Sequence, residues 1–384
     1  MTRRRAAARA APNIPSPTTP AADRFVMPAE WGPHRATWVA WPHNRGDWPG
    51  KLEAVDWCYV ELVRQLSAAE PVAVVFAGAA QERRALGRLS RAGVDLDRVE
   101  RYHLPTNRSW IRDSGGTFVT RPGGPGAGDE VALIDWRFNA WAKYDDWSRD
   151  NTVPTGIAAA RGLGRTTPRR PGGRQVVLEG GSVDVNGAGA LLTTEECLLD
   201  QVVQSRNPGL EREGIEAALR DNLGVETVIW LGGGIAGDDT HGHVDDIARF
   251  VAEDVVVAAI ETDQSDANHR PLADNLARLR RVRWRGRPLT VVPIPMPRPL
   301  WFAAQRLPAS YLNFYVANGR VLVPTFNDPA DRVALDRLAD LFPDREVVGV
   351  HAVDLVLGLG TLHCATLQEP AGRRPEQSRS PHTR

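Results

Sequence analysis

The sequence predicts an α/β fold, in which short apolar strands alternate with amphipathic helices. A β-branched or apolar run, then a polar turn, then a helical pattern recurs along the chain. The chain has 384 residues, of which 42% are hydrophobic and 24% are charged, so it can bury a large core. The recurring units differ in length and are not the closely matched repeats of a solenoid.

Each unit is recognised by its strand. The expected strands are residues 72–77, 131–136, 190–194, 255–260 and 321–324. Amphipathic helices are expected after four of them, at 81–93, 195–200, 270–281 and 332–342. Two arrangements accommodate these units: an open α/β sheet, or a ring of α/β modules with a site at its centre.

The glycine-rich run at 232–234 does not favour a nucleotide-binding open sheet. It follows the strand-like VIWL, but the next residues, IAGDDTHGHVDD, lack the GxGxxG spacing and the helix start that hold a pyrophosphate. A glycine-rich turn can instead let the backbone approach a ligand closely.

Charge and hydropathy exclude two classes of partner. Lys plus Arg equals Asp plus Glu at 47 each, whereas a nucleic-acid-binding domain is expected to be basic. The N-terminal arginines precede no apolar signal segment, and no apolar run approaches the roughly 18 residues that cross a membrane. We therefore expect no nucleic-acid partner, no membrane partner and a cytoplasmic location, whereas homo-oligomerisation stays open.

The three cysteines, Cys58, Cys197 and Cys364, are far apart in the sequence and form no CxxC pair. Neither a disulfide framework nor a cysteine-rich zinc site is expected. Cys58 and Cys197 lie in helix-like contexts and are interpreted as structural. Residues 1–24 and 372–384 contain little to bury, so we expect disordered tails around a single folded domain at 25–371.

Four segments are dense in catalytic residue types. They are SWIRDSGG (109–116), VLEGGSVDV (177–185), GDDTHGHVDD (237–246) and GLGTLHCATLQEP (358–370). Taken singly, the first segment could form only a local ion pair and the second only a turn. Cys364 in the fourth segment could be an inert, packed side chain. The third would also suit a divalent metal, with His241, His243 and carboxylates as ligands.

In this order, the four segments resemble the agmatine deiminase and Porphyromonas-type peptidylarginine deiminase family of guanidine-modifying hydrolases. Further similar stretches are MPAEWGPHRATWVAWP (27–42), FNAWAKYDDW (138–147) and SYLNFYVANGRVLVPTFND (310–328). The resemblance implies the pentein fold, a five-bladed α/β propeller with pseudo-fivefold repeats around a central active site. It also implies no cofactor, no metal and a small-molecule guanidine substrate.

The implied chemistry has a physical rationale. A guanidinium is planar and permanently charged, and its donors form a fixed fork that suits carboxylates. By resemblance, Asp113 and Asp245 bind it. The guanidinium carbon is a poor electrophile, and a thiolate that forms a covalent thiouronium intermediate divides the reaction into easier steps. Cys364 matches that nucleophile, and the bound cation together with a protonated His243 would favour its thiolate.

The remaining roles also come from the resemblance. His243 matches the general acid and base that protonates the departing ammonia and then activates water. Glu179 matches the acidic partner that orients this histidine. Trp110 matches a tryptophan of the substrate channel, with a core position as its alternative. His241 is an alternative to His243, whereas His363 is expected to point away from the nucleophile because neighbours on an extended segment face opposite sides.

The segment at 107–116 departs from the family pattern NDSWxRDTGP, since Arg108 replaces an acid and Gly116 a proline. The lost acid could remove a partner for the free amine of agmatine, and Arg108 could attract a carboxylate.

The resemblance implies hydrolysis of agmatine to N-carbamoylputrescine and ammonia. Four alternatives stay open: deimination of free or peptidyl arginine, amidinotransfer, silent binding of guanidines or polyamines, and metal-dependent hydrolysis.

Overall fold

The computed structural model describes residues 18–124 and 128–372. The expected tails at 1–17 and 373–384 lie outside these residues. Residues 18–24, also expected to belong to a tail, form a turn against α6 (Arg212–Leu223), where the Ala21 amide donates to the Asp221 carbonyl at 3.0 Å.

One strand pattern occurs in five sheets. In each sheet a strand pairs antiparallel with one neighbour and parallel with the other, and the first sheet adds a fourth strand, parallel to the third. The sheets, in strand order, are β20 (Thr366–Pro370), β1 (His34–Ala40), β2 (Val72–Phe76) and β3 (Val99–His103); β4 (Thr117–Arg121), β5 (Glu130–Ile134) and β6 (Gly164–Thr166); β7 (Asp184–Val185), β8 (Ala190–Thr194) and β9 (Thr227–Leu231); β10 (Ala248–Ala252), β11 (Val255–Ile260) and β14 (Thr290–Pro295); and β17 (Tyr315–Ala317), β18 (Arg320–Thr325) and β19 (Glu346–His351).

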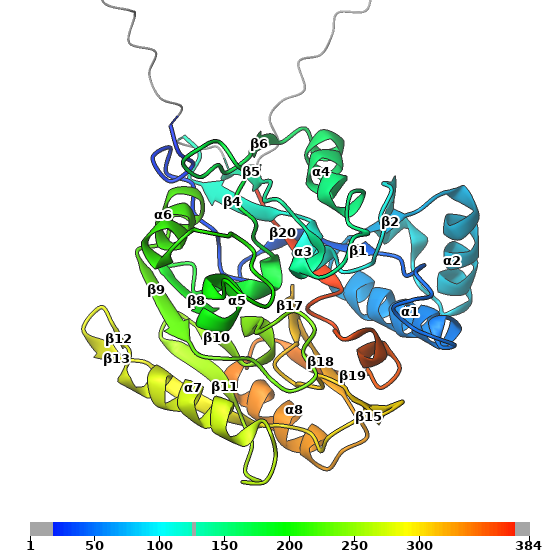
Figure 1. Ribbon diagram of the computed structural model, residues 1–384. Helices are drawn as coiled ribbons and strands as arrows, with labels where there is room; N and C mark the ends of the chain where they lie inside the picture. Colours follow the sequence, from blue (N-terminus) through cyan, green and yellow to red (C-terminus); the bar gives the residue numbers. More distant parts are fainter. Residues whose placement is uncertain (1–17, 125–127, 373–384) are drawn as a thin grey trace, which may run out of the picture.

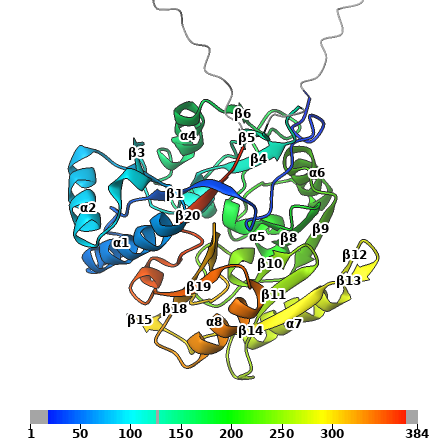
Figure 2. The same cartoon turned by 180° about the vertical axis from the view of Figure 1, so that it is seen from behind.

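Helices connect the parallel strands, because such strands cannot be joined by a tight turn. The connecting helices are α1 (Leu52–Ala69), α2 (Ala79–Arg91), α4 (Val153–Arg161), α5 (Glu195–Leu199), α6, α7 (His269–Arg281) and α8 (Ala330–Leu341). The helices α2, α4, α6, α7 and α8 lie on the outside of the molecule (Figures 1 and 2). Two short hairpins, β12–β13 (Arg283–Trp284, Arg287–Pro288) and β15–β16 (Trp301–Phe302, Gln305–Arg306), complete the described strands.

The predicted α/β class is confirmed. A strand is present at each of the five expected positions and a helix at each of the four. The helix expected at 195–200 ends at Leu199, because Asp200 adopts an extended backbone (ψ 127°) and its carboxylate accepts from the Val202 amide at 2.6 Å.

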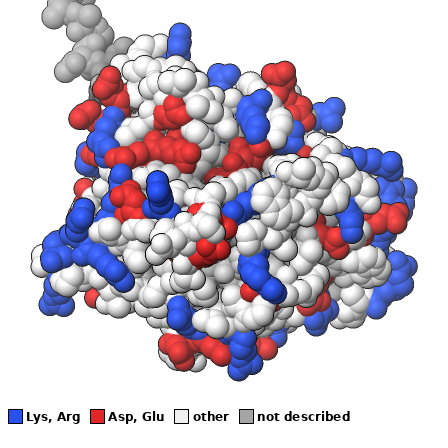
Figure 3. Space-filling model, turned by 60° about the horizontal axis from the view of Figure 1, so that its bottom comes forward, with Lys and Arg blue, Asp and Glu red and all other residues white. Residues whose placement is uncertain are grey.

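Acidic and basic side chains are interspersed on the face shown in Figure 3, as the balanced composition leads one to expect. Among the helices of the described residues, none combines the length and the apolar character needed to span a bilayer.

Candidate active site

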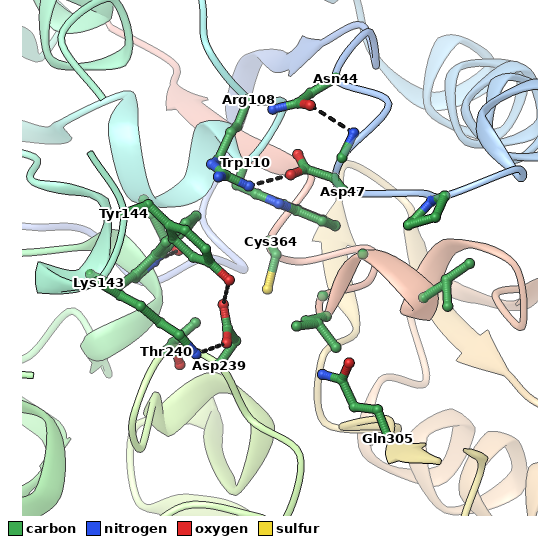
Figure 4. A pocket seen from close by; sticks show the side chains of 18 of the residues that line it. Asn44, Asp47, Arg108, Trp110, Lys143, Tyr144, Asp239, Thr240, Gln305 and Cys364 are labelled. Atoms are coloured by element: carbon green, nitrogen blue, oxygen red, sulfur yellow. Dashed lines mark hydrogen bonds and ion pairs between the residues drawn. The ribbon is translucent and has the colours of Figure 1, made fainter. Parts of the chain in front are cut away.

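A cavity of about 770 Å³ holds the side chain of Cys364 (Figure 4). Its walls come from segments that are far apart in the sequence, including 44–49, 108–113, 141–146 and 357–364. Trp110 and Asp113 also line it. The other expected site residues, Glu179, His243 and Asp245, are fully buried.

Cys364 lies in a turn between the 3-10 helix η6 (Leu355–Gly358) and β20, and is 5% exposed. The Asn313 side chain donates from Nδ2 to the Cys364 thiol sulfur at 3.1 Å. Its Oδ1 accepts the backbone amides of His363 and Cys364 at 3.0 and 3.3 Å. One carboxamide therefore holds both the thiol and the backbone of the turn.

Asp113 lies in the short helix α3 (Ile111–Ser114). Its Oδ2 accepts from Trp141 Nε1 and its Oδ1 from the Gly181 amide, both at 2.9 Å. These two bonds fix the carboxylate in the cavity wall.

Asp245 is held by His363, whose ring lies between the carboxylates of Asp245 and Glu30. Its Oδ2 lies 2.6 Å from His363 Nδ1 and 3.7 Å from the Cys364 sulfur. His363 Nε2 lies 2.8 Å from Glu30 Oε2. His363 therefore links the carboxylates of Asp245 and Glu30 through its two ring nitrogens. Asp245 Oδ1 has no hydrogen-bond partner among the described residues, which leaves it available to a ligand.

His363 lies closer to the nucleophile's surroundings than the expected extended segment would place it. Residues 361–365 form a turn and not an extended segment, so neighbouring side chains need not face opposite sides. The ring is absent from the cavity lining, yet it contacts Asp245 directly. His363 is therefore a support for the carboxylate beside Cys364.

His243 is fully buried between two other carboxylates. Its Nε2 lies 3.7 Å from Glu179 Oε2, and its Nδ1 lies 3.8 Å from Asp113 Oδ1. Glu179 is held in turn by Arg206, whose Nε donates to Oε1 at 3.1 Å. Within the described chain neither ring nitrogen of His243 has a hydrogen-bond partner, so both are left available to a ligand.

Gly181, in the LEGGS segment, allows these groups to converge. A Cβ atom on this glycine would lie 2.5 Å from His243 Nδ1, 2.9 Å from Asp113 Oδ1 and 3.0 Å from Asp245 Oδ2. No side chain fits at this point, which explains the glycine.

His241 takes another position. Its Nε2 lies 2.6 Å from Asp200 Oδ2, just beyond the end of α5, and its backbone has a positive φ of 63°. Cys197, interpreted as structural from its helical context, does lie in α5, but its thiol is close to Glu179 and His243. The candidate ligand atoms of these three lie within 4.8 Å of one another. Because Glu179 already binds Arg206, the trio is a poor metal site.

The electrostatics of the site favour a bound cation. Burial and the carboxylates of Asp245 and Asp246 raise the pKa of the Cys364 thiol well above its usual value. Burial opposes the charged form of His243, but the Asp113 carboxylate and the Cys197 thiol outweigh it and raise the pKa of the imidazole well above normal. Burial also raises the pKa of Asp113. The surroundings of Cys364 are thus anionic, and a cationic ligand would relieve the repulsion.

Arg108 lines the mouth of the cavity but is already paired (Figure 4). Its guanidinium forms ion pairs with Asp47 and with Asp146, the latter at 3.0 Å, and lies 4.2 Å from the centre of the Tyr144 ring. Lys143, also at the mouth, pairs with Asp239. Both cations are therefore neutralised by carboxylates of the same wall.

Some supporting residues could not be singled out from the sequence. Asn313, Trp141 and Arg206 are remote from the residues they hold, and nothing in the spacing of the chain indicates these contacts. Asn313 and Trp141 do lie in stretches that carry the family resemblance, SYLNFY and FNAW. This resemblance is the only feature of the sequence that could have indicated these two residues.

Comparisons with known proteins find similarity over nearly the whole chain. Residues 26–370 match the family described as Porphyromonas-type peptidyl-arginine deiminase. An agmatine deiminase of Ectopseudomonas mendocina is 38% identical, over 92% of this chain and 98% of its own length. The solved agmatine deiminase of Enterococcus faecalis superposes with a TM-score of 0.82 at 33% identity, over 92% of this chain and 98% of its own. The structure of a putative arginine deiminase from Porphyromonas gingivalis superposes with a TM-score of 0.80 at 36% identity, over 91% of this chain and 98% of its own.

The chain thus belongs to the Porphyromonas-type peptidyl-arginine deiminase family. The family expected from the four segments is confirmed.

Proposed function

We propose that this protein is an agmatine deiminase, which hydrolyses agmatine to N-carbamoylputrescine and ammonia through a covalent intermediate on Cys364. One observation carries the proposal. The Cys364 thiol, the carboxylates of Asp113 and Asp245 and the unpartnered imidazole of His243 meet around Gly181, with Asp245 Oδ2 3.7 Å from the sulfur. The similarity to named agmatine deiminases over nearly the whole chain supports the same reading.

Asp113 and Asp245 would bind the guanidinium by charge-assisted hydrogen bonds. Both carboxylates are fixed by buried partners, Asp113 by Trp141 and Asp245 by His363. Preorganised in this way, they hold the planar group without losing side-chain freedom when it binds. Trp110, in the cavity wall, would pack against the aliphatic arm.

In the first half-reaction the Cys364 thiolate attacks the guanidinium carbon and forms a C–S bond. The C–N bond to one terminal nitrogen then breaks, and ammonia leaves with a proton from the His243 imidazolium. The high pKa of His243 suits this donation. A positively charged thiouronium remains on Cys364.

In the second half-reaction the neutral His243 takes a proton from water, which attacks the same carbon. The C–S bond breaks, the electron pair returns to sulfur, and the ureido product forms as its O–H proton passes through solvent to the released ammonia, which becomes ammonium. Glu179, held by Arg206, would orient the imidazole in both steps. No atom is gained or lost beyond one water consumed and one ammonium released.

The substrate itself would help to ionise the nucleophile. Asp245 and Asp113, two of the three carboxylates that raise the pKa of the Cys364 thiol, are those that would bind the guanidinium. Once their charge is balanced by the bound cation, the thiolate becomes easier to form. Attack would therefore be favoured only when substrate is present.

The mouth of the cavity favours a substrate with a cationic tail. Arg108 and Lys143 are paired with acids, and three carboxylates of the wall (Asp47, Asp146 and Asp239) outnumber them. A tail ammonium suits this wall better than the α-carboxylate of arginine. The hypothesis that Arg108 attracts a carboxylate loses its basis.

Peptidylarginine is a second candidate because of the size of the cavity. About 770 Å³ lies toward the upper end of the range for small-molecule pockets and exceeds what agmatine fills.

Product release tests the proposal. Purified protein is offered agmatine, free arginine and a blocked arginyl peptide, and ammonia and the ureido product are measured. We expect release from agmatine foremost, loss after alkylation with iodoacetamide, and indifference to chelators. Absence of product from agmatine would refute the proposal, and loss on chelation would favour metal-dependent hydrolysis.

We also infer that the five sheets are the blades of a five-bladed α/β propeller around this site, and that residues 25–371 form one catalytic domain. The recurrence of one strand pattern with an outer helix supports the first inference. A core cluster that spans Val39 to Ala365 supports the second.

A further inference from the structure

A second cavity, of about 530 Å³, shares no lining residue with the one that holds Cys364. Three segments surround it: 137–139, 169–177 and 205–208. The middle segment is a short turn in which the Arg170 amide donates to the Arg174 carbonyl at 2.9 Å, with Gly172 and Gly173 at positive φ.

The lining of this cavity is strongly basic and includes no Asp or Glu. Five arginines contribute to it: Arg137, Arg169, Arg170, Arg174 and Arg206. Arg206 pairs with Glu179, but no described carboxylate lies within 4.0 Å of the other four guanidinium groups. Paired arginines are common elsewhere on this protein, as at Arg165 with Asp135 and Arg285 with Glu253. Four guanidinium groups without a carboxylate partner around one cavity give it a positive potential, which attracts anions.

Several of these arginines are held in place by neutral groups. Arg169 Nη1 donates to the Gly173 carbonyl at 2.7 Å, and Arg170 Nη1 donates to the Pro208 carbonyl at 2.8 Å. The Arg137 guanidinium lies 5.0 Å from the centre of the Trp147 ring. A guanidinium has five N–H donors, so each group retains donors for a ligand while its position is restrained.

A hydroxyl group adds to these donors. Ser205 lines the cavity, and its Oγ is buried without a hydrogen-bond partner among the described residues. Its neighbour Asn207 uses its amide on the Val177 backbone and is not free. An anion with several oxygens would satisfy Ser205 together with the guanidinium groups.

We propose that this cavity binds a multiply charged phosphate compound, such as an oligophosphate or the phosphate chain of a nucleotide. A guanidinium group can donate two hydrogen bonds to one phosphate, and four guanidinium groups without a carboxylate partner match a chain of phosphates better than a single anion. The proposal does not depend on the deiminase reaction, because it concerns a separate cavity.

Calorimetric titration of the full-length protein at low ionic strength tests the proposal, with phosphate, pyrophosphate, tripolyphosphate, ATP and citrate as separate probes. We expect one site per chain, with tripolyphosphate or ATP bound more tightly than phosphate or citrate. Tighter binding of ATP than of tripolyphosphate would identify the nucleotide as the source of the phosphates. Equal binding of phosphate or citrate would overturn the assignment to phosphate chains.

Variants locate the site. The double variant Arg169→Ala/Arg174→Ala should bind tripolyphosphate about tenfold more weakly. The control Arg283→Ala/Arg287→Ala removes the same charge from the distant β12–β13 hairpin and should bind like the wild type. Thermal unfolding establishes that both variants are folded. No binding by the wild type, or equal weakening in both variants, would refute the proposal.

Discussion

The Cys364 thiol and the groups around it carry the proposed chemistry, so single substitutions test it most sharply. Cys364→Ser should lower kcat by about a thousandfold or more while agmatine still binds, because the carboxylates that hold the guanidinium are separate from the nucleophile. Steady-state kinetics and calorimetric binding measure the two effects. The control is Cys58→Ser in α1, which should keep wild-type turnover. Retained turnover in Cys364→Ser would contradict the assignment.

The anionic surroundings of Cys364 predict how alkylation depends on pH. Since burial and nearby carboxylates raise the pKa of this thiol, its reaction with iodoacetamide should be slow at neutral pH and accelerate as the pH rises. Asp245→Asn removes a negative charge, so it should lower that pKa and speed the reaction at a fixed pH of about 8.

The matched control is Asp354→Asn, which removes a charge near Cys58 instead. Peptide mass spectrometry separates alkylation of the two thiols. Full reactivity of Cys364 at acidic pH in the free protein would contradict this electrostatic account.

At the scale of the element, the turn Gly180–Ser182 decides whether the site can form. Gly181→Ala would bring a methyl group within 3.0 Å of His243, Asp113 and Asp245, so we expect loss of most turnover. The control is Gly87→Ala in α2, where nothing lies within 4 Å of the added Cβ, and which should raise the unfolding free energy by about 1 kcal/mol. Wild-type kcat in Gly181→Ala would show that the three groups do not converge as described.

The segment before β1 is tied to the site through Glu30. Its carboxylate pairs with Arg112 and Arg249 at 3.2 and 3.0 Å and lies 2.8 Å from His363. Glu30→Gln leaves the buried Arg112 without a counter-charge, whereas Arg249 keeps Asp184, and should cost about 3 kcal/mol or more in unfolding free energy. Glu53→Gln, at an exposed position of α1, should cost little. Chemical denaturation measures both, and equal effects would contradict the role of Glu30.

The ion pairs of Glu30 also predict how the free energy of unfolding depends on pH. Burial opposes ionisation, but Arg249 and His363 outweigh it and lower the pKa of Glu30 well below its usual value. The ionised Glu30 therefore stabilises the fold fully above the pKa of this group in the unfolded state, about 4.3. This stabilisation is lost as the pH falls towards the lower pKa of Glu30 in the folded state. Glu30→Gln should show a shallower loss of stability below about pH 4.3 than the wild type.

At the scale of the whole molecule, the fold was predictable because it is built from local patterns. The runs at 190–194 and 255–260 are strands with the bounds expected, since β-branched runs ended by polar turns encode them directly. Residues 18–24 were not expected to pack, because their few contacts with α6 depend on tertiary structure.

The candidate site could be proposed from the sequence to the extent that its residues carry a recognisable motif. The resemblance picked out Cys364, His243 and Asp113, whereas the contacts that hold them come from residues remote in sequence, such as Asn313. The ion pairs of Arg108 could likewise not be predicted from the sequence, because Asp47 and Asp146 come close to it only in the folded chain.

The most direct measurement is the mass of the protein quenched in acid during turnover of agmatine. We predict a fraction of protein heavier by agmatine less ammonia, with the adduct on the peptide that contains Cys364 and absent from Cys364→Ser. Turnover with no adduct at any quench time, combined with retained activity of Cys364→Ser, would contradict attack by this thiol.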